Sequence, residues 1–102
     1  MARTVTWTHA AWSDLEGTAD YIARDSKAYA AALVREARDA ARSLAHFAER
    51  GRVVPEFDIP SVRELLVGNY RLIYGVEDRE VQIVAFFHGS RDLEAKWGRS
   101  GS

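Results

Sequence analysis

The chain has 102 residues, of which 47% are hydrophobic and 28% are charged, and its formal net charge is -1. This length and composition predict one small folded domain and exclude a disordered chain. The balanced charge argues against strong sequence-independent binding of nucleic acid, which needs a clustered basic surface. The chain has no cysteine, so disulfides and thiolate chemistry are excluded. Its three histidines lie in separate segments, and we therefore expect no metal site and no cofactor.

The first half of the chain is predicted to be a short strand followed by two helices. Alternation over residues 4–7 predicts the strand, with Val5 and Trp7 on one face. From about residue 10, apolar residues recur at helical spacing, and we place Trp7 and Trp12 in the core where strand and helix meet. A second, alanine-rich helix is expected to begin after Ser26 as its N-cap.

The second helix is expected to continue through the apolar residue Phe47 and to be closed by Gly51, because glycine commonly follows the last helical turn. Residues 52–61 contain both prolines and are predicted to be a loop. Three strands are then predicted, at residues 62–67, 70–76 and 81–87.

These elements predict an α+β fold of order β-α-α-β-β-β, with a helical hairpin packed on one face of a small antiparallel sheet. We expect a single domain over residues 1–97 and a flexible tail over residues 98–102. No stretch resembles a signal peptide or a membrane span, which favours a cytoplasmic protein.

Turn chemistry predicts the register of the three strands. The Gly68-Asn69 turn places Val67 opposite Tyr70, and the next connection places residues 76 and 81 opposite each other. The face that should carry the helices then includes residues 85 and 87. The other face has Arg71 opposite Phe86, with His88 as a diagonal neighbour.

A polar cluster is therefore expected at one end of the open face, formed by Arg71, His88 and Arg91. An imidazole exchanges protons near neutral pH, and two guanidinium groups can clamp a phosphate. The alternative is purely structural: Arg71 pairs with Glu64, Arg91 pairs with Asp92, and His88 caps the end of the sheet. Spacing alone leaves both interpretations open.

Two motifs then carry a resemblance to a known family. The run VRELLVGNYRLIY at residues 62–74 and the run FHGSRDL at residues 87–93 together resemble the RelE/ParE toxin superfamily. The order of the preceding strand and helices matches as well, so the resemblance covers nearly the whole chain. It implies the small toxin of a type II toxin-antitoxin pair, with two helices packed on an antiparallel sheet and a cognate antitoxin as its protein partner.

The resemblance to RelE-like members implies cleavage of messenger RNA on the ribosome, where Arg71 and Arg91 match arginines that position the RNA. Trp97 falls near the place of a catalytic tyrosine, and an indole can stack on a base but cannot act as a phenol. Another nuclease branch uses a glutamate and a histidine, for which Glu56 as general base and His88 as general acid are the candidates.

The resemblance to ParE-like members implies poisoning of DNA gyrase and requires no nuclease residues. It rests on residues 51–55, 63–65 and 88–92, and the near-neutral charge also suits a protein target. We therefore favour gyrase as the target, contacted by Arg63, Arg71, Arg91 and Trp97. Ribosome-dependent cleavage of mRNA, and a non-toxic binding module of the same fold, are the alternatives.

The antitoxin is expected to cover an apolar patch on the open face of the sheet. Its predicted members are Leu66, Ile73, Val84 and Phe86, since an exposed apolar patch of this kind marks a partner surface. The alternative is that the C-terminal residues around Leu93 and Trp97 fold over it.

Overall fold

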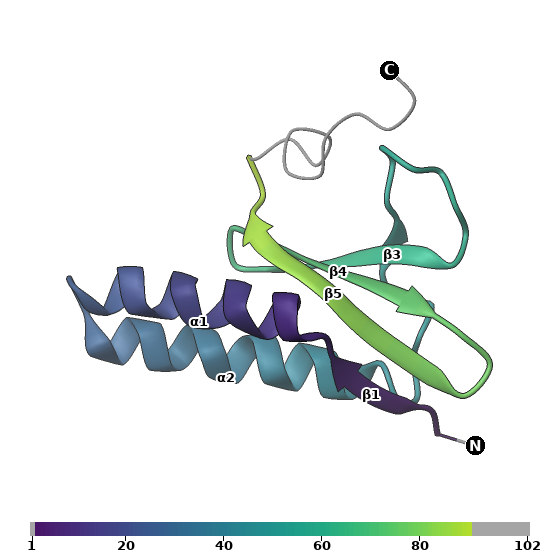
Figure 1. Ribbon diagram of the computed structural model, residues 1–102, viewed down its shortest axis with the longest axis horizontal. Coiled ribbons are helices and arrows are strands. Elements are labelled where there is room, and N and C mark those ends of the chain that lie inside the picture. The colour runs from purple at the N-terminus through teal and green to yellow at the C-terminus, as the bar shows by residue number, and fades with distance from the viewer. Residues whose placement is uncertain (1, 91–102) are drawn as a thin grey trace.

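Two helices lie side by side against one face of a five-stranded sheet (Figure 1). This computed structural model describes residues 2–90. The predicted roles of Arg91 and Trp97, and the predicted tail at 98–102, lie outside the described residues. The elements in chain order are β1 (Thr4–Trp7), α1 (His9–Ala23), α2 (Lys27–Ser43), β2 (Arg52–Val53), β3 (Val62–Val67), β4 (Tyr70–Val76) and β5 (Glu80–His88).

Hydroxyl side chains begin both helices. Thr8 caps α1 by accepting a hydrogen bond of 3.1 Å from the backbone N–H of Ala11. Ser26 caps α2 in the same way, accepting a hydrogen bond of 3.1 Å from the N–H of Tyr29. Each cap satisfies one of the amide groups that has no partner within the helix. The predicted N-cap at Ser26 is confirmed.

The second helix ends earlier than predicted. α2 stops at Ser43, and Phe47 is 66% exposed instead of lying on the buried stripe. The N–H groups of residues 44–46 bond to carbonyls three residues back, so the chain tightens into turns after Ser43. The carbonyl of Ala45 accepts a hydrogen bond of 2.8 Å from the N–H of Arg3, just before β1. Gly51 is therefore not a helix cap, and it lies buried beside β3.

The sheet has the order β1-β5-β4-β3-β2. The α+β class and the helical hairpin on one face are confirmed, but the sheet is mixed, because β1 runs parallel to β5. A further short strand, β2, pairs with β3 within the segment predicted to be a loop. The three predicted hairpin strands are confirmed to within one residue at each end.

The predicted register holds at both turns and is wrong in the middle of β5. Val67 faces Tyr70 across the first turn, as expected. Between β4 and β5 the register shifts, because Tyr74 faces Ile83 whereas the preceding residue, Ile73, faces residue 85. Residue 84 is thus an extra residue in β5, and such a bulge reverses the faces of all residues beyond it.

The bulge moves several side chains to the opposite face from the predicted one. Arg71 faces Phe87 instead of Phe86, and His88 faces Tyr70. Phe86 lies in the core beneath the helices, where it is 1% exposed. Phe87 lies on the other face of the sheet, in a second apolar cluster. Arg71 and His88 therefore project from opposite faces.

The main core lies between the helices and the sheet, and it includes the partly buried Trp7 and Trp12. Their rings pack edge to face with centroids 5.4 Å apart, which confirms the predicted core position of both residues. A smaller cluster lies on the other face and includes Ile73 and Val54, which comes from the segment after β2. Neither helix within residues 2–90 is long and apolar enough to cross a membrane.

Candidate functional site: a locked arginine and an aromatic groove

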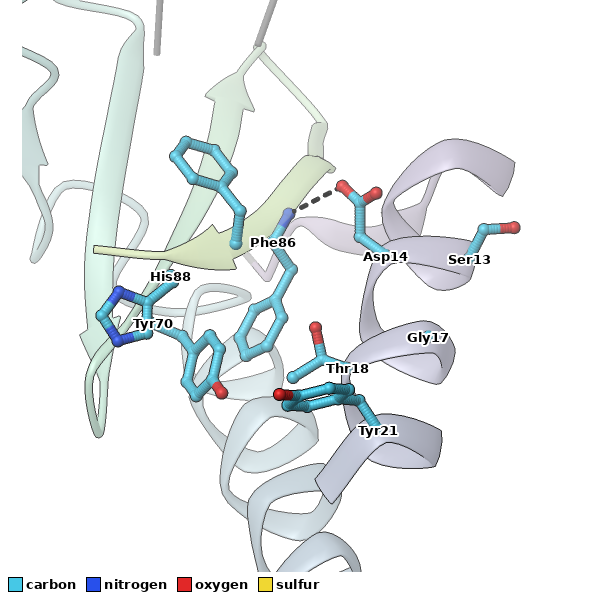
Figure 2. A pocket seen from close by; sticks show the side chains of 9 residues that line it. Ser13, Asp14, Gly17, Thr18, Tyr21, Tyr70, Phe86 and His88 are labelled. Carbon is cyan, nitrogen blue, oxygen red and sulfur yellow. Dashed lines mark hydrogen bonds between the residues drawn. The ribbon is translucent and has the colours of Figure 1, made fainter. Parts of the chain in front are cut away.

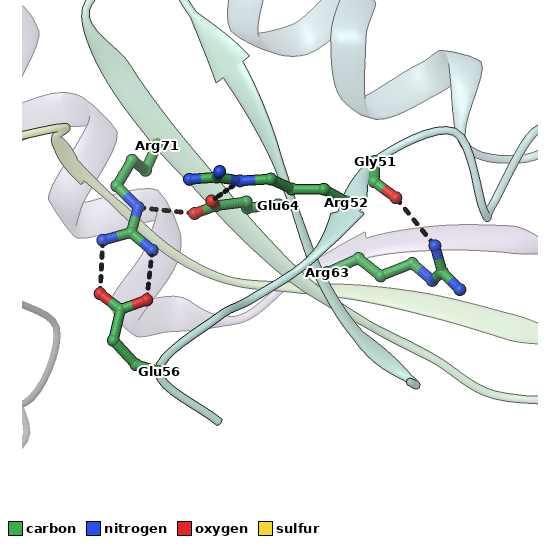
Figure 3. A network of polar contacts seen from close by, with 6 residues as sticks. All are labelled: Gly51, Arg52, Glu56, Arg63, Glu64 and Arg71. Carbon is green, nitrogen blue, oxygen red and sulfur yellow. Dashed lines mark hydrogen bonds and ion pairs between the residues drawn. The ribbon is translucent and has the colours of Figure 1, made fainter. Parts of the chain in front are cut away.

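Arg71 lies at the centre of an ion-pair network on the face of the sheet away from the helices (Figure 3). Its Nε donates a hydrogen bond of 2.5 Å to Glu64, on the neighbouring strand β3. Its two terminal nitrogens each donate a hydrogen bond of 2.9 Å to the carboxylate of Glu56. This two-pronged arrangement matches the planar fork of a guanidinium to a carboxylate and is among the stronger pairings in proteins.

The network is largely shielded from water. The side chain of Arg71 is 7% exposed, that of Glu56 is 23% exposed and that of Glu64 is 1% exposed. Arg52, on β2, is the last member of the network, and its Nε lies 2.5 Å from the second carboxylate oxygen of Glu64. The hydrogen bonds from Arg71 to Glu56, reinforced by Glu64, outweigh burial and raise the pKa of the Arg71 guanidinium above its usual value. Arg71 is therefore charged at every accessible pH.

Glu56 comes from the loop that follows β2, which sequence analysis did not place. Val54 anchors this loop in the second apolar cluster, and the pairing of Glu56 with Arg71 holds it against the sheet. Arg63 supports the loop from the other side, since its guanidinium donates to the carbonyls of Pro60 and Gly51 at 2.9 Å each. The carboxylate of Glu56 is thus committed to an arginine.

A close backbone approach next to the network requires glycine at position 51. A Cβ atom built there would lie 2.4 Å from the carbonyl oxygen of Glu64 and 2.5 Å from the hydroxyl of Tyr74. The Tyr74 hydroxyl accepts a hydrogen bond of 3.0 Å from the N–H of Gly51 and donates one of 2.8 Å to the carbonyl of Ala48. Burial raises the pKa of the Tyr74 hydroxyl above 10.0. The tyrosine thereby joins the segment before β2 to the sheet.

His88 lies on the helix-facing side of the sheet, where its ring packs edge to face on Tyr70 with centroids 5.4 Å apart. Its Nδ1 accepts a hydrogen bond of 3.1 Å from the N–H of Ser90. The structure thus does not bring His88 together with Arg71 and Glu56. The pairing of Arg71 with Glu64, which sequence analysis kept as the structural alternative, is the arrangement observed.

The predicted apolar patch is not an exposed surface. Ile73 is fully buried in the second apolar cluster, which includes Val54, and Phe86 belongs to the core beneath the helices. Val84 is partly buried, and only Leu66, at 68%, is strongly exposed. The bulge in β5 and the loop after β2 together account for the difference.

A groove that was not predicted from the sequence lies between α1 and the end of β5 (Figure 2). Its volume is about 510 Å³. The lining residues come from α1, β4 and β5: Ser13, Asp14, Gly17, Thr18, Tyr21, Tyr70, Phe86, Phe87 and His88. No pattern in the sequence marks this groove, because it depends on the bulge that turns Phe86 toward the helices. Within residues 2–90, no group of three or more His, Cys, Asp or Glu residues is placed to hold a metal ion.

The family model described as "ParE toxin of type II toxin-antitoxin system, parDE" matches residues 5–93. The chain belongs to this toxin family. It is thus a toxin of a type II toxin-antitoxin system within the RelE/ParE superfamily, as its sequence motifs predicted. It is also 38% identical over 92 residues to Toxin RelE2 of Caulobacter vibrioides, an alignment that covers 89% of this chain and 99% of that relative.

Two solved structures resemble the fold of this family member. The chromosomal ParDE system from P. aeruginosa has a TM-score of 0.69 and 23% identity, covering 85% of this chain and 96% of that one. The toxin-antitoxin complex RelBE2 from Mycobacterium tuberculosis has a TM-score of 0.58 and 24% identity, covering 86% and 99% of the two chains. At these identities the likeness establishes the fold: two helices packed on a mixed five-stranded sheet.

Proposed function

We propose that this toxin stops bacterial growth by poisoning DNA gyrase, and that a cognate antitoxin binds and restrains it. The matching family model is described by the name ParE, the branch that sequence analysis associated with gyrase. Both solved neighbours come from toxin-antitoxin systems, which supports an antitoxin as the protein partner.

The hydrogen bonds and burial of Arg71 are the observation that supports gyrase over RNA as the target. A nuclease needs a cation that faces the phosphate as negative charge develops on it. Here the Arg71 guanidinium donates hydrogen bonds to two carboxylates and is almost entirely buried. A general base would likewise need an available carboxylate, whereas that of Glu56 is held by both oxygens. These contacts support a role for Arg71 and Glu56 in stability and favour a protein target.

Ribosome-dependent cleavage of mRNA is the second candidate. It is favoured by the 38% identity to a protein named Toxin RelE2. In this alternative Arg91 and His88 are the candidate reactive groups, and Arg71 and Glu56 would first have to separate from each other.

Controlled expression in bacteria tests the proposal. We expect induction of the chain alone to stop growth, to produce broken DNA held in gyrase complexes, and to leave messenger RNA intact. Co-expression of the protein encoded by the adjacent reading frame should restore growth. Normal growth with abundant, soluble, full-length chain would instead favour the non-toxic binding module. Arrest with cut mRNA and intact DNA would favour the ribosome.

A further inference from the structure

A second pocket lies where the segment after α2 meets the start of the chain. Its volume is about 390 Å³, and its lining residues are Arg3, His46, Phe47, Ala48, Glu49 and Arg50. Figure 1 shows the start of the chain beside the turn between β4 and β5, where the N–H of Thr4 bonds to the carbonyl of Arg79. None of the residues in the ion-pair network around Arg71 lines this pocket, so it is a separate site.

Both arginines of the pocket are held in place by uncharged oxygen atoms. The Nε of Arg3 donates a hydrogen bond of 2.8 Å to the carbonyl of Glu77, and a terminal nitrogen of Arg50 donates one of 2.7 Å to the hydroxyl of Ser43. Within residues 2–90, neither arginine forms an ion pair. A guanidinium has five N–H donors, and a neutral acceptor positions it without cancelling its charge. Unlike Arg71, these two cations therefore keep both charge and donors for a ligand.

An exposed aromatic ring lies in the same pocket. Phe47 is 66% exposed, and its ring is tilted by 58° against that of His46, with centroids 6.4 Å apart. A single exposed apolar side chain is common on a protein surface. A ring together with arginines that have no ion pair is, however, the composition of sites for single-stranded nucleic acid, where a base stacks on the ring and the cations hold the phosphates.

The charge of the pocket is positive, although the chain as a whole carries -1. Glu49 is the one carboxylate among the lining residues, so the two guanidinium groups leave a positive surplus even without His46. So small a surplus supports modest, salt-dependent binding of a short strand. It does not support the strong sequence-independent binding that needs a broad basic surface.

We propose that this pocket binds an unpaired segment of a DNA strand, with its phosphates paired to Arg3 and Arg50 and a base stacked on Phe47. The proposal rests on the proposed function and deepens it, because poisoned gyrase holds broken DNA and a strand end at the break offers both groups. The planar fork of a guanidinium pairs with two phosphate oxygens at once. A free nucleotide such as ATP carries the same groups, so the test must separate these two sources.

The salt dependence of DNA binding tests the cations. We would titrate the purified full-length toxin into a short, fluorescein-labelled single strand of DNA and follow fluorescence anisotropy at several salt concentrations. Arg50→Ala should weaken binding and reduce the slope of log affinity against log salt by about 0.7, the value for one lost phosphate contact on a single strand. Arg35→Ala is the matched control. It removes the same charge from an exposed position on α2 outside the pocket and should leave the slope unchanged.

Two neighbouring positions test the ring and the carboxylate. Phe47→Ala should weaken binding by about tenfold, because the stacked base loses its platform. Tyr29→Ala, which removes a 59% exposed ring from α2 outside the pocket, should change the affinity less than about twofold. Glu49→Gln removes the repelling charge and should strengthen binding by about threefold at low salt. All these side chains are exposed, so circular dichroism should show every variant folded.

Equal salt slopes for Arg50→Ala and Arg35→Ala, or equal affinities for Phe47→Ala and Tyr29→Ala, would overturn the site. Competition separates the sources: unlabelled DNA should displace the probe, whereas displacement by ATP at an equal or lower concentration would assign the pocket to a free nucleotide and overturn the proposal.

The gyrase reaction separates failure of the pocket from failure of the proposed function. Arg50→Ala should yield less cleaved plasmid than Arg35→Ala at the same toxin concentration. A wild-type chain that poisons gyrase but does not bind the strand would overturn the pocket alone. A wild-type chain that binds the strand but neither poisons gyrase nor arrests growth would refute the proposed function, and with it this use of the pocket.

Discussion

Glu56 and Arg71 are 15 residues apart in sequence and are joined by two hydrogen bonds of 2.9 Å. The pair connects the loop after β2 to the start of β4, so it holds the loop against the sheet. Glu64 accepts a hydrogen bond from the remaining nitrogen, Nε, of the same guanidinium. Arg71, which was a candidate for binding phosphate, therefore stabilises the fold.

Removing the guanidinium should strongly destabilise the protein. Arg71→Ala breaks the ion pairs with Glu56 and with the buried Glu64, which keeps only the exposed Arg52 as a partner. Removing one member of a buried ion pair costs about 3 kcal/mol. Arg42→Ala is the control, since Arg42 pairs with Asp39 on an exposed face of α2, and it should change the free energy of unfolding by no more than about 0.5 kcal/mol. Urea denaturation measures both. Similar small losses in the two variants would contradict the structural role of Arg71.

Weakening the pair should open the loop without unfolding the domain. Glu56→Gln removes the charge and one strong hydrogen bond to Arg71, at a cost of about 1–2 kcal/mol. Phe57, the next residue, is 36% exposed and is a natural site for chymotrypsin. We expect faster cleavage after Phe57 in the variant than in the wild type under native conditions. Unchanged cleavage would show that the other contacts of the loop hold it without Glu56.

Two glycines should respond in opposite directions to the same substitution. Gly51→Ala introduces a Cβ atom against the Glu64 carbonyl and the Tyr74 hydroxyl, and we expect a loss of at least about 2 kcal/mol. Gly17 is in α1, with open space around its Cα, so Gly17→Ala should stabilise the helix by up to about 1 kcal/mol. Thermal unfolding followed by circular dichroism distinguishes them. Equal shifts in Tm would contradict the close approach at Gly51.

We expect the free energy of unfolding to fall at alkaline pH because of Tyr74. Its pKa in the folded protein is raised by burial above 10.0, so the unfolded chain releases this proton first as the pH rises. The contribution of Tyr74 is therefore complete below about pH 10 and declines at higher pH. Tyr74→Phe should be less stable at pH 7, because the Ala48 carbonyl and Gly51 N–H lose their partner, and its stability should fall less steeply above pH 10. Parallel slopes from urea denaturation at several pH values would contradict this.

Local sequence signals predicted most elements of the fold. The Gly68-Asn69 turn and the β-branched runs beside it located the hairpin strands to within one residue, and the hydroxyl at Ser26 located the start of α2. The strand β2 was missed because two residues carry no periodicity, and its pairing depends on a distant strand.

The candidate site was harder to predict, and the bulge in β5 is the reason. Residues 81–87 are nearly all apolar, so alternation gives no sign that residue 84 is extra. Because the extra residue in β5 was not predicted, His88 was expected beside Arg71, whereas it packs on Tyr70. For the same reason the aromatic groove was not predicted. The Arg71–Glu64 pair was predictable because the two residues lie on β4 and β3, whose register contains no bulge.

The central claim is that this toxin acts on gyrase and that the buried arginine does not cut RNA. The most direct measurement adds one purified preparation of the full-length chain to two reactions: supercoiling of relaxed plasmid by gyrase, and translation in a cell-free extract. We predict loss of supercoiling with accumulation of cleaved plasmid, while translation continues with intact messenger RNA. Arrest of translation with cleaved messenger RNA and normal supercoiling would contradict the account.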